Sequence, residues 1–225
     1  MCGRFTLTQS GWAIAQAFNL AEIPQIAPQY NIAPRQQVAA ILYNAEGKKR
    51  QFQELSWGLI PSWAKDKSIG YKLINARTET VAEKPSFRSA FKQRRCLVIA
   101  DGFYEWQKQE NHKHKKQPYY FRLQDRQPFA FAGLWEKWQS PDGEEITSCT
   151  ILTTEANELM QSIHERMPVI LHPQDYDLWL DPQVKSLEEL QQVFHPYPAE
   201  SMTSYPVSTL VNSPKNNSPE CVNSQ

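Results

Sequence analysis

Short apolar segments along the chain predict a fold that consists mostly of β-strands. Runs of apolar or alternating residues, bounded by polar, glycine or proline residues, are typical of strands. Such runs occur at Val38–Tyr43, Arg50–Trp57, Leu73–Ala76, Cys96–Ala100, Phe103–Lys108, Tyr119–Leu123, Phe129–Trp135, Cys149–Thr153 and Val169–Leu171, and around Val207. Because short turns join most of them, we expect mainly antiparallel pairing.

Apolar residues recur with the spacing of an α-helix in only a few short stretches. Helices are expected at Thr8–Leu20, Ser86–Arg94, Glu155–Ile163, Asp175–Leu180 and Leu187–Phe194. Prolines keep residues 21–36 mostly irregular, and turns are expected at Glu46–Gly47 and at the polar stretch 112–116. The polar composition of residues 212–225 is typical of a tail. The pattern therefore predicts an α+β fold, and the lack of internal repeats or linkers favours a single domain.

Length and charge narrow the class of protein. A chain of 225 residues is long enough to bury a core without disulfide or metal cross-links. Lys and Arg number 24, as do Asp and Glu, so the net charge is zero. This balance argues against a protein that coats DNA or a membrane by bulk charge, although a local basic groove stays compatible with it.

The four cysteines and the start of the chain bear on the compartment. Cys2, Cys96, Cys149 and Cys221 form no CxxC pair, and such spacing is typical of reduced thiols in the cytoplasm. No apolar run approaches the length of a membrane span. The first residues do not resemble a signal peptide, so we expect the mature protein to begin very near residue 1.

Cys2 has unusual chemistry if the initiator methionine is removed. It then carries a free α-amine and a thiol on adjacent carbons. The amine has a pKa of roughly 7.7–8.0 against about 10.4 for lysine, so far more of it is neutral near pH 7.5. Amines attack aldehydes to form Schiff bases, and the neighbouring thiol can close a five-membered thiazolidine ring. On position alone, however, Cys2 is more simply an ordinary second residue.

Glu105 is a candidate acid or base. Strand alternation puts it on the same face as Phe103, with Tyr104 and Trp106 on the other. Aromatic neighbours and the apolar run before them favour partial burial, which raises the pKa of a carboxyl group. The alternative is a glutamate that points outward from an edge strand.

Four further residues stand at predicted element ends or in loops. His164 follows a predicted helix, where it is either a proton shuttle or a simple helix cap. Asn75 can donate and accept hydrogen bonds at once. Arg77 can bind a phosphate or pair with Glu79. Trp63 either packs into the core or stacks on an unpaired base.

Seven motifs run in order through nearly the whole chain: Met1–Phe5, Tyr30–Pro34, Trp57–Trp63, Asn75–Thr80, Asp101–Trp106, Ile163–Pro168 and Val211–Asn212. Together they resemble those of the SRAP family, the abasic-site processing proteins first named SOS response-associated peptidases. Any one alone is weak, but the ordered set is specific. The resemblance implies one SRAP domain over residues 2–222, with a curved, barrel-like β-core, peripheral helices, and residues Val211–Asn212 packed near the site.

The resemblance also implies a mechanism. The Cys2 amine attacks the aldehyde of an abasic site in single-stranded DNA, and the thiol closes a thiazolidine, giving a stable DNA–protein crosslink. Glu105 orients the amine or takes its proton, His164 passes a proton to the sugar oxygen, and Asn75 holds Cys2. Flanking phosphates and bases would be bound by Arg4, Arg77, Arg166, Thr153, Trp63 and Pro34. Some members carry two adjacent tryptophans where this chain has Trp63 and Ala64.

The expected partner is single-stranded DNA containing abasic sites, with no metal, no small-molecule cofactor and no membrane. We expect a cytoplasmic monomer, associated with the nucleoid on damage if the source is bacterial. Two other functions stay open: a cysteine peptidase with Cys2 as nucleophile, including self-removal of Met1, and a non-catalytic module that binds single-stranded DNA. A Schiff base at an abasic site can also cleave the strand by β-elimination, which is a lyase activity.

Overall fold

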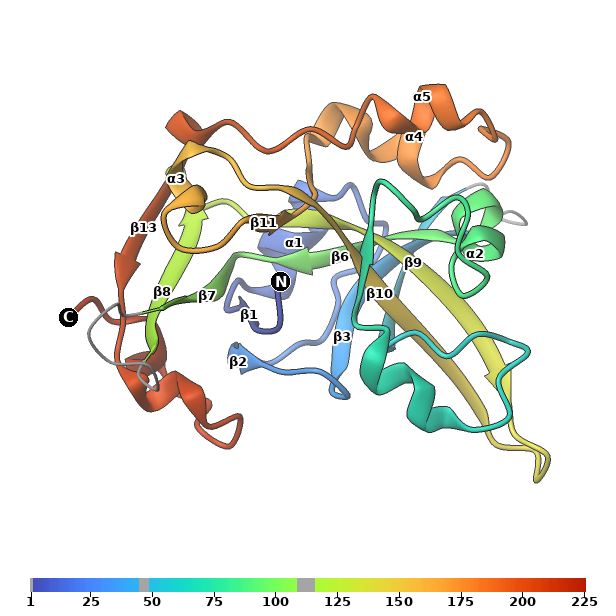
Figure 1. The fold of residues 1–225 in the computed structure, drawn as a ribbon, viewed down its shortest axis with the longest axis horizontal. Coiled ribbons are helices and arrows are strands. Elements are labelled where there is room, and N and C mark those ends of the chain that lie inside the picture. Colours follow the sequence, from blue (N-terminus) through green and yellow to red (C-terminus); the bar gives the residue numbers. More distant parts are fainter. Residues whose placement is uncertain (1, 45–48, 109–115) are drawn as a thin grey trace.

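The computed structural model describes residues 2–44, 49–108 and 116–225. Five strands form a closed barrel: β3 (Gln37–Asn44), β4 (Lys49–Trp57), β10 (Glu145–Glu155), β9 (Phe129–Gln139) and β6 (Arg95–Ala100). Each pairs with the next around the ring, and β6 pairs again with β3. All of these pairings are antiparallel except that of β10 with β4. The barrel lies to the right in Figure 1.

Three short strands extend the edges of the barrel where it opens. These are β5 (Asn75–Arg77) and β11 (Arg166–Pro168), which pair with β10, and β12 (Ile170–Leu171), which pairs with β9. The six residues of β6 are all buried, and the apolar run Cys96–Ala100 within it is typical of a strand covered on both faces. The apolar run in the sequence therefore marks the centre of the core.

A second sheet packs beside the barrel, in the order β13-β8-β7-β1-β2. Its strands are β13 (Met202–Pro206), β8 (Lys116–Leu123), β7 (Gly102–Lys108), β1 (Phe5–Leu7) and β2 (Gln29–Ile32). Phe5 and Phe103 pair in this sheet, and Phe5 also packs on Trp57 of the barrel, 5.0 Å between ring centres. The start of the chain thus lies where the second sheet meets the barrel, near the middle of Figure 1.

The junction of β1 with this sheet is fixed by one buried carboxylate. Asp101 accepts hydrogen bonds from the Thr6 hydroxyl (2.5 Å), from the Thr8 hydroxyl and backbone N–H, and from the Gln9 N–H (3.1 Å). Hydrogen bonds to a charged acceptor are stronger than neutral ones. Four such donors hold the strand that follows Cys2 in one place.

The helices are short and peripheral (Figure 1). The α-helices are α1 (Gly11–Ala17), α2 (Arg88–Gln93), α3 (Glu158–Gln161), α4 (Tyr176–Leu180) and α5 (Leu187–Gln191). Short 3-10 helices occur at η1 (Lys67–Lys72), η2 (Pro173–Asp175), η3 (Ala199–Ser201), η4 (Thr209–Asn212) and η5 (Pro219–Val222). The predicted α+β fold, with a mainly antiparallel, barrel-like core and peripheral helices, is confirmed.

Two sequence predictions are wrong. The helix expected at Glu155–Ile163 is only α3, because Glu155 pairs with Arg166 as the last residue of β10. Residues 212–225 are not a free tail: Ser224 forms a β-bridge with Val207, and Cys221 is fully buried. The predicted turn at Glu46–Gly47 and residues 112–115 of the second one lie outside the described residues.

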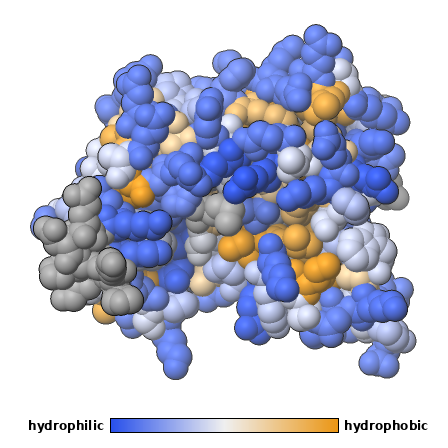
Figure 2. Space-filling view, viewed as in Figure 1, coloured by the Kyte–Doolittle hydropathy of each residue, from blue (hydrophilic) through white to orange (hydrophobic). Residues whose placement is uncertain are grey.

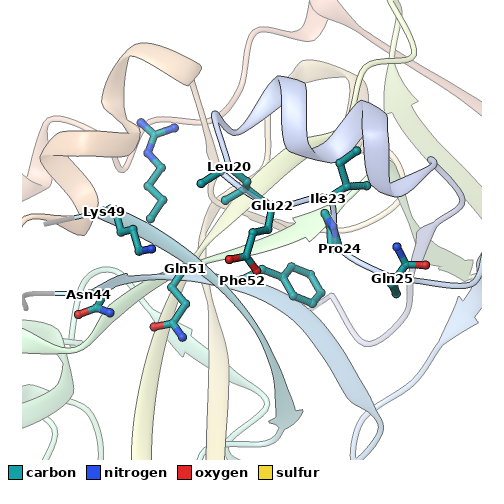
Figure 3. Close-up of a pocket in the computed structure, with 11 residues that line it drawn as sticks. Leu20, Glu22, Ile23, Pro24, Gln25, Asn44, Lys49, Gln51 and Phe52 are labelled. Atoms are coloured by element: carbon teal, nitrogen blue, oxygen red, sulfur yellow. The ribbon is translucent and has the colours of Figure 1, made fainter. Parts of the chain in front are cut away.

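A hollow of about 390 Å³ lies on the outside of the barrel. Figure 3 shows side chains of the 20–25 segment facing those of β4 and of Asn44. Glu22, Lys49, Gln51 and Phe52 line it, and it includes none of the site residues expected from the sequence.

Candidate active site

Cys2 lies fully buried and is held through its main chain. The Asn75 side-chain amide donates a hydrogen bond to the Cys2 carbonyl oxygen (2.8 Å), and the Cys2 thiol lies 3.9 Å from the carbonyl oxygen of Arg4. Asn75 begins β5, which the barrel strand β10 fixes by parallel pairing. The other side-chain atom of Asn75, Oδ1, is buried without a hydrogen-bond partner in the described part of the chain. Asn75 therefore positions Cys2, and its buried Oδ1 can still accept a hydrogen bond.

Glu105 is close enough to Cys2 for its charge to act on the thiol. It is 4% exposed in β7, a strand with neighbours on both sides, so the alternative of an outward-pointing edge residue is wrong. Phe103 packs in the main core, while Tyr104 packs in a separate cluster with Trp106, which confirms the predicted alternation. Burial, and then the negative charge of Glu105, raise the pKa of the Cys2 thiol from 9.0 to about 12. At neutral pH the thiol is therefore protonated.

This raised pKa makes stability sensitive to alkaline pH. A thiol whose pKa is higher in the folded state stabilises the fold below its unfolded pKa, and this stabilisation is lost as the pH rises through the folded pKa. We expect the free energy of unfolding to fall between about pH 9 and pH 12, the interval spanned by the two Cys2 values. Urea unfolding at a series of pH values measures it.

Cys2→Ala is the control for that experiment, because other buried groups such as Cys149 and Tyr120 also have raised pKa values through burial. The difference in unfolding free energy between wild type and Cys2→Ala should shrink above about pH 9. A difference that stays constant through this range would show that the Cys2 thiol is not held in its protonated form.

His164 lies between α3 and β11, half-buried. Its Nδ1 lies 2.9 Å from the Arg166 backbone nitrogen and 3.2 Å from the Arg166 carbonyl oxygen. Nδ1 can therefore accept from the N–H in one neutral tautomer or donate to the carbonyl in the other. Gln107, on the same strand face as Glu105, donates to the Ser162 carbonyl (3.0 Å) and ties this loop to β7.

Arg166 and Thr153 form one cluster with Glu79. Arg166 makes a two-pronged ion pair with the Glu79 carboxylate and donates to the Thr153 carbonyl oxygen (2.6 Å). The Arg166 hydrogen bond lowers the pKa of Glu79. The alternative that Arg77 pairs with Glu79 is wrong, because among the described residues Arg77 forms no ion pair, and it is exposed. Thr153 is fully buried.

Arg4 joins the first residues of the chain to its last segment. Its guanidinium donates to the Asn31 side chain (2.7 Å) and to the Val211 carbonyl (2.6 Å), and lies 5.7 Å from the centre of the Trp106 ring. Burial lowers the pKa of Arg4. Trp106 in turn donates to the Asn212 side chain (2.7 Å). The C-terminal motif thus packs against the residues that follow Cys2.

Sequence reasoning missed Asn31 as a member of this arrangement. Its amide donates to the carbonyl oxygens of Ser213 (3.0 Å) and Asn216 (2.6 Å), while its own oxygen accepts from Arg4. The signal was present, because Asn31 stands inside one of the seven motifs. Its partners are backbone carbonyls, however, and these leave no trace in the residue types of the C-terminal segment.

Comparison with known proteins places this arrangement in a family. The model of the family described as SOS response associated peptidase (SRAP) matches residues 1–214. The chain belongs to the SRAP family.

Relatives of this SRAP chain carry informative names. The Bacillus subtilis protein named "Abasic site processing protein YoqW" is 48% identical over 227 residues, which cover 100% of both chains. The Xenopus tropicalis protein named "Abasic site processing protein HMCES" is 35% identical and matches 87% of this chain and 65% of its own length. A crystal structure of a Bacteroides thetaiotaomicron protein superimposes with a TM-score of 0.86 at 28% identity, covering 100% of both chains.

The two residues that the SRAP resemblance assigns to base contacts lie in loops. Trp63 is 59% exposed in the loop between β4 and η1, so the alternative that it packs into the core is wrong. Pro34 is half-buried in the turn between β2 and β3. The face shown in Figure 2 carries apolar surface near its middle with polar surface around it. An apolar patch with a polar rim is typical of a binding surface.

Neither a metal site nor a membrane span emerges from the described residues. No group of three or more His, Cys, Asp or Glu side chains in residues 2–44, 49–108 and 116–225 is placed to hold a metal ion. Within the same ranges, no helix has the length and apolar character needed to cross a bilayer.

Proposed function

We propose that this protein captures abasic sites in single-stranded DNA as a covalent thiazolidine at Cys2, once Met1 has been removed, and thereby shields the lesion. The observation that carries the proposal is the placement of Cys2: the second residue of the chain is buried, held by Asn75 and adjacent to Glu105. The names of its relatives as abasic site processing proteins support the same substrate.

The first chemical step is attack of the Cys2 amine on the C1′ aldehyde of the ring-opened sugar. The C–N bond forms, the carbonyl oxygen leaves as water, and a Schiff base remains. The amine must lose protons in this step, and the Glu105 carboxylate is the buried base next to Cys2. The buried Asn75 Oδ1 can accept a hydrogen bond from the amine and orient its lone pair towards the aldehyde.

The second step is ring closure by the thiol. Sulfur bonds to C1′, the C=N bond becomes single, and the thiol proton ends on nitrogen, so no external reagent is needed. A protonated thiol supplies that proton, which agrees with the raised pKa of Cys2. The ring also removes the imine that water would otherwise hydrolyse.

His164 acts before these steps, when the closed sugar must open to the aldehyde. Opening breaks the C1′–O4′ bond, puts a proton on O4′ and takes one from the C1′ hydroxyl. When Nδ1 of His164 donates to the Arg166 carbonyl oxygen, the proton of the neutral ring is on Nδ1 and Nε2 has a free lone pair. Nε2 can then take the proton of the C1′ hydroxyl and give one to O4′, so that the ring ends neutral.

DNA contacts would come from Arg4, Arg77, Arg166 and Thr153 for phosphates and from Trp63 and Pro34 for bases. Arg77 is exposed and suited to a direct phosphate contact. Arg166 would share its guanidinium between Glu79 and a phosphate. Arg4 already holds Asn31 and Val211, so its contribution includes shaping the site. We further propose that the protein works as a monomer in the cytoplasm, at the nucleoid after damage if it is bacterial.

The family description as a peptidase points to a second activity of the same residue. Removal of Met1 by the protein itself would be an autopeptidase reaction that exposes the amine. The raised pKa of the Cys2 thiol bears on both reactions, because sulfur is the nucleophile in each. The names of the relatives as abasic site processing proteins favour the reaction with abasic sites over cleavage of other proteins.

The test mixes purified protein with single-stranded DNA that carries one abasic site. We expect a slowly migrating band on a denaturing gel, stable to heat, when mass spectrometry shows that Met1 is absent. Intact DNA of the same sequence should give no band. Protein with an uncleavable N-terminal tag should give none either, since its Cys2 amine is blocked. A band of equal strength from the tagged protein would exclude the amine mechanism.

A further inference from the structure

A small pocket lies next to the segment that carries Asn75. It has a volume of about 160 Å³, and its lining includes Arg35, Trp57, Gly58, Lys67 and Tyr71. The Trp57 indole N–H donates to the Ile74 carbonyl oxygen (2.9 Å), and the next residue, Asn75, donates to the Cys2 carbonyl. The pocket wall and Cys2 are therefore linked through consecutive residues of one segment.

The pocket is built on two backbones in close contact. A Cβ atom on Gly58 would lie 2.6 Å from the Gly70 carbonyl oxygen, and one on Gly70 would lie 2.7 Å from the Gly58 carbonyl oxygen. Gly58 also has a φ of +127°, which side chains rarely tolerate. Because neither glycine has a side chain, the loop after β4 can pack directly against the backbone of η1. The helix η1 carries Tyr71 at the pocket rim.

Arg35 is held in place over Tyr71. Its backbone lies in the left-handed region, at φ 76°, and its N–H donates to the Trp57 carbonyl oxygen (2.8 Å). Non-glycine residues in this region often occur at functional sites. The Arg35 guanidinium lies 4.4 Å from the centre of the Tyr71 ring, so a planar cation covers one part of an aromatic ring.

Both side chains remain accessible. Arg35 is exposed and Tyr71 is 52% exposed. Within the described ranges of the chain, Arg35 forms no ion pair, whereas Lys67 on the same rim is paired with Glu144 (3.0 Å). At this pocket, the positive charge without an ion-pair partner among the described residues is therefore that of Arg35. The accessible aromatic surface is that of Tyr71 beside it.

We propose that Arg35 and Tyr71 form a subsite for one unpaired nucleobase of the DNA strand, next to the abasic nucleotide that Cys2 captures. Arginine planes and tyrosine rings are the side chains on which unpaired bases stack, and such stacking tolerates any base. The adjacent residue Pro34 and the exposed Trp63 in the loop between Gly58 and η1 lie on the same two segments. This subsite rests on the proposed function, because it requires that single-stranded DNA approaches Cys2.

The experiment measures equilibrium binding of a fluorescent single-stranded oligonucleotide with a tetrahydrofuran abasic analogue at its centre. This analogue has no aldehyde, so binding is measured without crosslinking. In a series of oligonucleotides, one flanking nucleotide at a time is replaced by a spacer without a base. For the wild type, we expect one flanking position at which loss of the base weakens binding roughly five- to tenfold.

Tyr71→Ala should weaken binding of the complete oligonucleotide to a similar extent, and should show no further loss with the spacer at that position. Arg35→Gln should do the same, and Tyr71→Phe should bind like the wild type because it keeps the ring. Arg88→Gln on α2 is the control that removes one exposed positive charge elsewhere. Thermal unfolding verifies that each variant is folded.

Two results would overturn the subsite. In one, the spacer series is flat for the wild type, so that no flanking base is bound. In the other, the losses from Tyr71→Ala and from the spacer multiply at every position, so that the ring and the base act independently. If the wild type binds in this pattern but forms no crosslink with aldehyde-bearing DNA, the subsite stands and the proposed covalent chemistry fails.

Discussion

Replacing Cys2 with serine should abolish the heat-stable crosslink to abasic DNA. The serine amine can still form a Schiff base, but the hydroxyl group does not close a comparably stable ring, and water hydrolyses the imine. We expect at least a 100-fold loss of the heat-stable band, measured by denaturing gel after boiling. Addition of borohydride before boiling should restore the band, because reduction converts the imine into a stable amine.

Cys2→Ala separates the two steps further. It keeps the amine and lacks the thiol, so we expect borohydride-dependent crosslinking together with faster cleavage of the DNA strand by β-elimination than in the wild type. A boiled, unreduced Cys2→Ala sample with a wild-type band would mean that another side chain holds the sugar. Equal loss of all bands in both variants, with folding intact, would mean that the thiol is needed before the imine forms.

Replacing Glu105 with glutamine should slow crosslinking about 100-fold at neutral pH. General acid–base catalysis by one side chain commonly contributes about 10²- to 10⁴-fold, and Glu105 is the buried carboxylate whose charge acts on Cys2. The substitution keeps the size of the side chain and removes its charge. Single-turnover rates over a range of pH measure the effect, with the exposed Glu83→Gln as the matched control.

A second readout distinguishes catalysis from a structural effect. Because the Glu105 charge raises the pKa of the Cys2 thiol, Glu105→Gln should lower that pKa, and a thiol-specific alkylating reagent should react with Cys2 at lower pH than in the wild type. If the rate falls but this titration does not move, Glu105 is not close to the thiol. If the titration moves and the rate stays unchanged, Glu105 is not the base.

The barrel was predictable because its strands are short apolar runs separated by turns. The buried apolar run Cys96–Ala100 in β6 and the alternation of Phe103 and Tyr104 in β7 follow directly from the sequence pattern, whereas the burial of Arg95 at the start of β6 does not. The failure at Glu155–Ile163 has a local cause: Glu155 pairs with Arg166 across a strand ladder, and Asn157 caps the helix two residues later. A long-range pairing of this kind overrides local helix preference.

Sequence motifs nominate the candidate site residues but do not give all of their contacts. Motifs named Cys2, Asn75, Glu105 and His164, and the structure shows how the first three meet. In the structure, Arg166 rather than Arg77 pairs with Glu79. Arg166 is in β11 and Glu79 follows β5, and both strands pair with the same end of β10. Charged residues near each other in sequence do not reveal such pairings.

The contact between Arg4 and Val211 has a consequence for how the protein is made. The polypeptide emerges from the ribosome with its first residues leading, yet Val211, which helps to fix them, is synthesised almost last. The surroundings of Cys2 can therefore reach their final arrangement only when the chain is nearly complete.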